Sequence, residues 1–176
     1  MPSNSRKPTG ADLSEILYGL LKADIKFILV GSLAAVVQGA PVTTMDIDIL
    51  HYRSHENIAT LLDFLKSIDA IHRRPDDKVI EAKEEDISGM GHALFRTRFG
   101  PLDVLGVIEG GRTYEDLLDH TVEIEFRGHI IHVLTLETLI DLKRASKEPG
   151  DRQRLSVLEE TFRQMKEKKG TTPEYT

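Results

Sequence analysis

The sequence of 176 residues contains no cysteine. This absence excludes disulfide bonds and metal sites with thiolate ligands. Nor does any apolar run approach the ~20 residues that a membrane-spanning helix needs. The first ten residues are polar and lack the apolar stretch of a signal peptide. We therefore expect a cytoplasmic protein with no membrane partner.

The sequence also lacks an excess of positive charge, since 29 acidic residues outnumber 23 lysines and arginines and give a formal net charge of −6. This balance disfavours long nucleic-acid polymers as partners. The same balance is compatible with a small nucleotide as ligand, because bound metal ions can neutralise its charge. The length and the 40% of apolar residues suit one domain with a sizeable core.

Two aspartates, Asp46 and Asp48, lie one residue apart in an apolar run that ends at Leu50. In a β-strand both would point to one face, ~7 Å apart, while Ile47 and Ile49 face the core. Two adjacent carboxylates in an apolar strand are costly unless a cation lies between them. Mg²⁺ prefers such oxygen ligands together with substrate phosphates. The pattern indicates phosphoryl or nucleotidyl transfer; the alternative is a solvated pair on an exposed edge strand.

A Gly-Ser pair, Gly31 and Ser32, directly follows the apolar run 26–30. We expect a strand to end and a short helix to begin here. Backbone N–H groups at such a junction favour a phosphate, glycine allows it to approach, and the serine hydroxyl can donate a hydrogen bond. The same pair can also be a simple strand-to-helix turn. A two-turn helix would return the chain so that Asp46 and Asp48 face this junction.

A third carboxylate is expected on a neighbouring strand, because two metal ions need more than two ligands. Asp103 is the best candidate, since it is a lone acid between apolar residues in the run 101–108. The alternative is a buried ion pair between Asp103 and an arginine such as Arg96 or Arg98.

The periodicity of apolar residues predicts a mixed order of helices and strands. The predicted helices cover about 12–23, 32–38, 55–68, 113–119, 135–148 and 151–167. The predicted strands cover 26–30, 45–50, 92–98, 101–108, 122–127 and 130–134. Segment 69–91 is polar and predicts a loop or an irregular strand. The fold class is therefore α+β, with a mixed β-sheet flanked by helices and a C-terminal helical pair. We expect a flexible arm (1–10), one domain (11–167) and a flexible tail (168–176).

Together these features resemble the polymerase-β-like nucleotidyltransferase superfamily. Its motif is a hydrophobic strand, Gly-Gly or Gly-Ser, Asp-x-Asp/Glu in a strand after a gap of about ten residues or slightly more, and later a third acid. Small stand-alone prokaryotic members, including AbiEii-type toxins, often show His-Gly-x-Pro-Arg-x-Thr-x-Asp-Ile-Asp. The corresponding segment 38–48 of this chain has Gln38 in place of the histidine and Val42 in place of the arginine.

The resemblance implies an enzyme that moves a nucleoside monophosphate from a nucleoside triphosphate (NTP) to an acceptor hydroxyl on a small molecule, a tRNA or a protein. Asp46, Asp48 and Asp103 would bind two Mg²⁺ ions, with Asp103 also helping to deprotonate the acceptor. Gly31 and Ser32 would hold the β- and γ-phosphates.

Two lysines four residues apart, Lys143 and Lys147, could reach the triphosphate from one helix face, or could simply cover a solvated helix end. The resemblance further suggests the toxin of a toxin–antitoxin pair, with an antitoxin protein as partner. Because Val42 replaces an arginine, a catalytically weak or inactive module on the same fold, binding a nucleotide or a partner, is the alternative.

Overall fold

The computed structural model describes residues 12–170. The predicted N-terminal arm and residues 171–176 of the predicted tail lie outside this range. Within it, no helix is long and apolar enough to cross a bilayer.

A mixed β-sheet of seven strands, in the order β3-β4-β5-β2-β1-β7-β6, forms the centre of the fold. Two neighbouring pairs are parallel, β2 with β5 and β1 with β7, and the other pairs are antiparallel. The strands are β1 (Phe27–Val30), β2 (Ile47–His51), β3 (Ile71–His72), β4 (His92–Thr97), β5 (Gly100–Leu105), β6 (Thr121–Phe126) and β7 (His129–Leu134). The predicted mixed sheet is confirmed.

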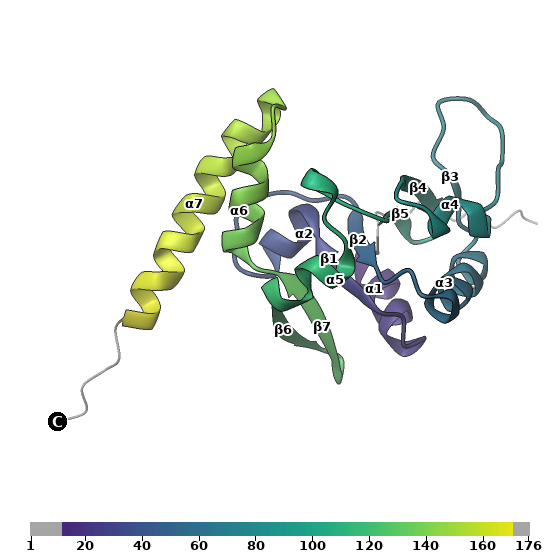
Figure 1. Ribbon diagram of the computed structural model, residues 1–176, viewed down its shortest axis with the longest axis horizontal. Coiled ribbons are helices and arrows are strands. Elements are labelled where there is room, and N and C mark those ends of the chain that lie inside the picture. Colours follow the sequence, from purple (N-terminus) through teal and green to yellow (C-terminus); the bar gives the residue numbers. More distant parts are fainter. Residues whose placement is uncertain (1–11, 171–176) are drawn as a thin grey trace, which may run out of the picture.

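Helices cover the sheet and form the C-terminal part of the chain (Figure 1). They are α1 (Leu13–Lys22), α2 (Gly31–Val36), α3 (His55–Ser67), α4 (Glu84–Ser88), α5 (Tyr114–Leu117), α6 (Leu136–Ala145) and α7 (Pro149–Gly170). Four of them begin after a residue whose side chain accepts a hydrogen bond from the first turn: Asp12, Ser54, Thr113 and Thr135. Such caps satisfy N–H groups that the helix itself leaves unpaired.

The core confirms the alternation predicted for Ile47, Asp48 and Ile49 within the strand 45–50. Ile47 and Ile49 are fully buried, on the face of β2 opposite to Asp48. The same apolar cluster includes Ile16 of α1 and Leu61 of α3. Burial on one face therefore holds the strand so that Asp48 points to the other face.

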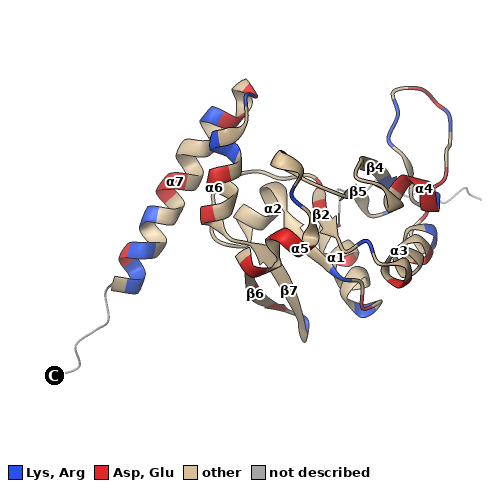
Figure 2. Ribbon diagram, viewed as in Figure 1, with Lys and Arg blue, Asp and Glu red and all other residues tan. Residues whose placement is uncertain are grey.

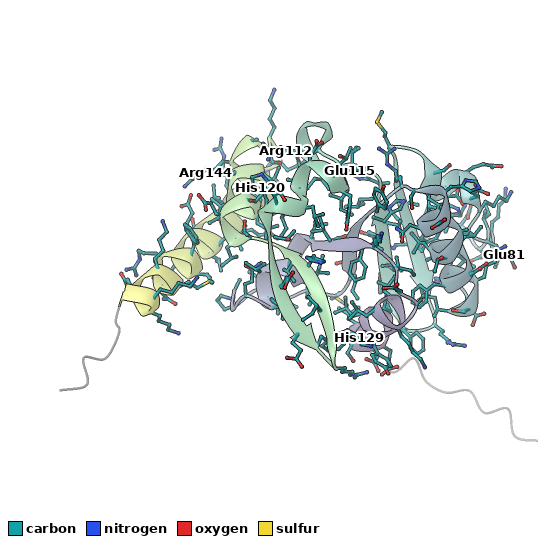
Figure 3. All side chains as sticks on the ribbon, turned by 60° about the horizontal axis from the view of Figure 1, so that its bottom comes forward. Glu81, Arg112, Glu115, His120, His129 and Arg144 are labelled. Atoms are coloured by element: carbon teal, nitrogen blue, oxygen red, sulfur yellow. The ribbon has the colours of Figure 1, made fainter. Side chains whose placement is uncertain are left out.

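The predicted C-terminal helical pair is formed by α6 and α7, which lie side by side at one end of the molecule (Figure 1). Arg144 of α6, labelled in Figure 3, donates to Glu159 of α7 at 2.9 Å. Leu158 of α7 is buried, whereas both signs of charge mark the rest of the helix (Figure 2). The helix spans Pro149–Gly170 and so extends beyond both ends of the predicted range of about 151–167.

Segment 69–91 contains more regular structure than its polar sequence indicated. It holds the two-residue edge strand β3 and the five-residue helix α4. The chain between them projects from the molecule as a loop (Figure 1). His72 and Asp86 form a hydrogen bond of 2.8 Å across the base of this loop.

Candidate active site

Three carboxylates converge at one point on the sheet. One oxygen from each of Asp46, Asp48 and Asp103 lies within 4.8 Å of the other two. The pairing of β2 with β5 explains this proximity, because its parallel register sets Asp48 directly opposite Asp103. Paired residues on neighbouring strands point to the same face, ~5 Å apart. The spatial convergence expected from the sequence is therefore present.

Asp46 reaches the cluster from outside the strand. We expected both aspartates of the pair within one strand, but β2 begins only at Ile47 and Asp46 lies in the bend before it. The hydroxyl of Thr44 donates to the backbone carbonyl of Asp46 at 3.0 Å and stabilises this bend. The carboxylate of Asp46 is thus placed by the turn rather than by strand alternation.

Gly31 lies against the carboxylate of Asp48. Its φ is +71°, a left-handed conformation that glycine adopts without steric strain. A Cβ atom added here would lie 2.1 Å from Oδ2 of Asp48. Helix α2 begins at Gly31 itself, one residue before the predicted start. The glycine therefore allows the backbone and the acid to approach closely.

The electrostatic environment of Asp48 disfavours its negative charge unless a cation is bound. Burial, the hydrogen bond with Asp103 and the negative charges of Asp103 and Asp46 together raise the pKa of Asp48 from 3.8 to about 8, against an opposing contribution from Arg73. A divalent ion would remove this penalty, and carboxylate oxygens are the ligands that Mg²⁺ prefers. The donor set therefore fits the metal that the sequence led us to expect.

Asp103 has an arginine partner, although not one of the two that the sequence suggested. The guanidinium of Arg73 donates both to the Asp103 carboxylate and, at 3.2 Å, to the backbone carbonyl of Phe95. Arg98 instead lies 3.7 Å from Asp69. The ion pair does not remove Asp103 from the acidic cluster, so pairing with an arginine and convergence with Asp46 and Asp48 occur together.

A cleft of about 250 Å³ opens in front of the acidic cluster. Asp48 and Asp103 lie in its lining. The lining also includes two sets of residues: the Gly-Ser junction together with two cations, and residues mainly from β4, β5 and the turn that follows. The first set is Gly31, Ser32, Lys143 and Arg154; the second is His92, Leu94, Leu105, Ile108 and Glu109.

The two lysines proposed from the sequence differ in position. Lys143 lines the cleft, and its Nζ lies 3.2 Å from Oδ1 of Asp151. Helix α6 ends at Ala145, so Lys147 is not on the same helix face. It is exposed, and the described lining of the cleft does not include it. The expectation that both lysines share one helix face was wrong.

Arg154 of α7 is a cleft residue that sequence reasoning missed. It lines the cleft together with Gly31, Ser32 and Lys143. It also borders a smaller cavity with Val42, the position where the resemblance leads one to expect an arginine. The packing of α7 against α6 brings Arg154 to this place, and no local pattern in the sequence predicts that packing.

Gln38, which stands where the resembling proteins have a histidine, has a structural role. Its side-chain amide donates to the backbone carbonyls of Ala34 and Leu134, each at 2.9 Å. The residue thereby ties the end of α2 to the end of β7. Both elements border the cleft through Ser32 and Leu134.

Comparison with known proteins identifies the fold. No protein-family profile and no curated protein sequence matches this chain. Solved structures do. A candidate nucleotidyltransferase from Thermotoga maritima is similar with a TM-score of 0.51 and 19% identity, over 82% of this chain and 93% of the other. The lincosamide antibiotic adenylyltransferase LnuA, bound to lincomycin, is similar with a TM-score of 0.54 and 16% identity, over 85% and 97%.

The chain has a nucleotidyltransferase fold. At sequence identities of 16–19% the comparison establishes the fold alone, and the reaction depends on the residues of the site.

Proposed function

We propose that this protein is a metal-dependent nucleotidyltransferase that moves a nucleoside monophosphate from an NTP to an acceptor hydroxyl. One observation carries the proposal. Asp46, Asp48 and Asp103 converge within 4.8 Å beside the Gly31 turn, in a cleft large enough to admit part of a nucleotide. The nucleotidyltransferase fold of the chain supports the same reaction class.

The three aspartates would hold two Mg²⁺ ions. Bound there, Mg²⁺ would neutralise the triphosphate and favour displacement at the α-phosphorus. Catalysis would come mainly from positioning and charge neutralisation, as for other phosphoryl transfers.

The triphosphate would lie against the side of the cleft formed by Gly31 and Ser32. The Ser32 hydroxyl and nearby backbone N–H groups can donate to phosphate oxygens. Lys143 and Arg154 add two positive charges on the same side. Arg154 would supply the cationic contact that Val42 cannot make. Lys147 has no part in this proposal, because it lies outside the lining of the cleft.

Asp103 would accept the proton of the acceptor. The acceptor oxygen would then attack the α-phosphorus, the bond between that phosphorus and the bridging oxygen to the β-phosphate would break, and pyrophosphate would leave. The acceptor would approach past Leu94 and His92, because both line the cleft and are exposed.

The proposal specifies the acceptor only as a compound with a reactive hydroxyl group. Lincomycin is bound by the lincosamide adenylyltransferase, and that ligand is not assigned to this chain. The toxin role and the antitoxin partner stay predictions from the resemblance. Growth arrest on expression, relieved by Asp48→Asn, would support the toxin role, and harmless expression of the active protein would contradict it.

A catalytically inactive nucleotide-binding or partner-binding module is the second candidate, because Val42 replaces an arginine. The complete set of three acids favours the enzyme. Arg154 beside Val42 weakens the argument for lost activity. Binding of NTP with no release of pyrophosphate, across a broad acceptor panel, would decide for the inactive module.

Calorimetric titration of the four NTPs, with and without Mg²⁺, tests the proposal. We expect Mg²⁺-dependent binding to the wild type, lost in Asp46→Asn and Asp48→Asn. Asp119→Asn is the matched control, because Asp119 is exposed and outside the cleft. Circular dichroism establishes that all variants fold. NTP binding that is equal without Mg²⁺, or equal in Asp48→Asn, would refute the proposed site.

A further inference from the structure

Arg73 is anchored to strand β4 by both its backbone and its side chain. Its N–H donates to the carbonyl of Leu94 at 2.8 Å, and its guanidinium donates to the carbonyl of Phe95 at 3.2 Å. The residue directly follows β3 and stands at the base of the projecting loop. Although this loop is polar, its first residue is therefore fixed to the sheet.

The register of the strands aligns Arg73 with the acidic cluster. The pairing of β3 with β4, continued by one residue, sets Arg73 opposite Leu94. Leu94 in turn lies opposite Asp103, and Asp103 opposite Asp48. Residues paired in this way point to one face of a sheet. Arg73, directly after β3, thus forms one row with Leu94 of β4, Asp103 of β5 and Asp48 of β2.

The guanidinium of Arg73 engages Oδ1 of Asp103. This contact restricts rotation of a carboxylate that is largely buried and leaves Oδ2 for another partner. Without a cation at Oδ1, repulsion from Asp46 and Asp48 would favour a rotamer that turns Asp103 away from them. Arg73 is thus placed to determine the orientation of the third acid.

We propose that Arg73 is a positioning residue, which holds Asp103 Oδ1 so that the other oxygen points to the site shared with Asp46 and Asp48. The proposal rests on the proposed function, because it assumes that this site binds metal ions. Hydrogen-bond partners of metal-binding carboxylates typically change metal affinity by about 10–100-fold when they are removed. Arg73 acts through Asp103 and has no assigned contact with the substrate.

Electron paramagnetic resonance of Mn²⁺ in the presence of a non-hydrolysable NTP analogue provides a test that needs no acceptor. We expect Arg73→Met to bind the more weakly held Mn²⁺ about 10–100-fold less tightly. Arg73→Lys should recover part of the loss, because it keeps the charge but not the planar fork of donors. Arg74→Met is the matched control. The guanidinium of Arg74 pairs with Asp76 at 2.7 Å within the exposed loop, and its removal should leave Mn²⁺ binding unchanged.

A double-mutant cycle separates positioning from a general structural role. If Arg73 acts through Asp103, adding Arg73→Met to Asp103→Asn should weaken Mn²⁺ binding no further. Fully additive losses, or wild-type binding by Arg73→Met, would overturn the inference. Thermal unfolding establishes that each variant is folded. Should Arg73→Met fail to fold, the cycle is carried out with Arg73→Lys, with the same two deciding outcomes.

The proposed function can fail separately in the same experiment. If wild type and Asp48→Asn bind Mn²⁺ equally, or neither binds it, the metal site itself is wrong and the inference about Arg73 falls with it. If Asp48→Asn loses Mn²⁺ while Arg73→Met matches Arg74→Met, only the role of Arg73 is refuted.

Discussion

The backbone of Gly31 and the carboxylate of Asp48 occupy adjoining space, so that a Cβ atom at position 31 would lie 2.1 Å from Asp48 Oδ2. This relationship joins two parts of the sequence motif that are 17 residues apart. Gly31 directly follows β1 as the first residue of α2, and Asp48 of the antiparallel neighbour β2 pairs with Val30, the last residue of β1. The glycine is therefore required both by its own φ and by the position of the acid.

Gly31→Ala should disable the site while leaving most of the fold intact. The left-handed φ costs a non-glycine residue about 1–2 kcal/mol, and the new methyl group would displace Asp48. We expect Mg²⁺–NTP binding to be lost. Gly128→Ala is the control, because Gly128 has a similar φ of +79° in the β6–β7 turn but no atom within 4 Å of an added Cβ. Equal NTP binding by the two variants would contradict this account.

The stability of the metal-free protein should depend on pH through Asp48. Its pKa is about 8 in the folded protein against an ordinary 3.8, so the folded state keeps a proton that the unfolded chain has lost. The protonated Asp48 side chain makes its full contribution to the free energy of unfolding below pH 3.8. This contribution is lost as the pH rises through about 8. Relative to Asp48→Asn, the wild type should lose at most about 1.4 kcal/mol of unfolding free energy per pH unit in this window.

Urea denaturation in the presence of a chelator measures this difference, at several pH values from about 5 to about 8. The comparison with Asp48→Asn cancels the titration of groups that the two proteins share. A difference between them that is constant with pH would show that Asp48 is ionised in the folded protein.

The two cations of the cleft should act on the triphosphate and on little else. Removing a charged hydrogen-bond donor typically costs about 1.5–3 kcal/mol. We therefore expect Lys143→Met and Arg154→Met each to weaken NTP binding about tenfold or more, with little effect on the monophosphate. Lys147→Met should match the wild type. Calorimetry with both nucleotides measures the contrast, and an equal effect of Lys147→Met would restore the prediction made from the sequence.

Much of the fold and the acidic cluster could be predicted because each depends on a short-range pattern. The alternation around Ile47 and Ile49 assigned one face of the strand to the core and so placed Asp48 on the other. Asp103 stood out because a lone acid within an apolar strand needs a partner. Each of these patterns spans only a few residues, and each corresponds to a contact that the structure contains.

Other parts of the site depend on packing between distant segments. Arg73 reaches Asp103 only because the two-residue edge strand β3 pairs with β4. A strand of two residues is too short to show the alternation of apolar and polar residues by which strands are predicted. Arg154 enters the cleft because α7 lies against α6. Pro149 suggested a helix break, but proline is also favoured in the first turn of a helix, and here α7 begins at it. The prediction that Lys147 shares a helix face with Lys143 was wrong because α6 ends earlier, at Ala145.

A crystal structure of the protein with Mn²⁺ and a non-hydrolysable NTP analogue tests the central claim most directly. We predict anomalous density for the metal among Asp46, Asp48 and Asp103, with the triphosphate extending from it past Ser32 toward Lys143 and Arg154. Metal or nucleotide bound elsewhere on the molecule, with the three carboxylates left without a cation at saturating Mn²⁺, would contradict the account.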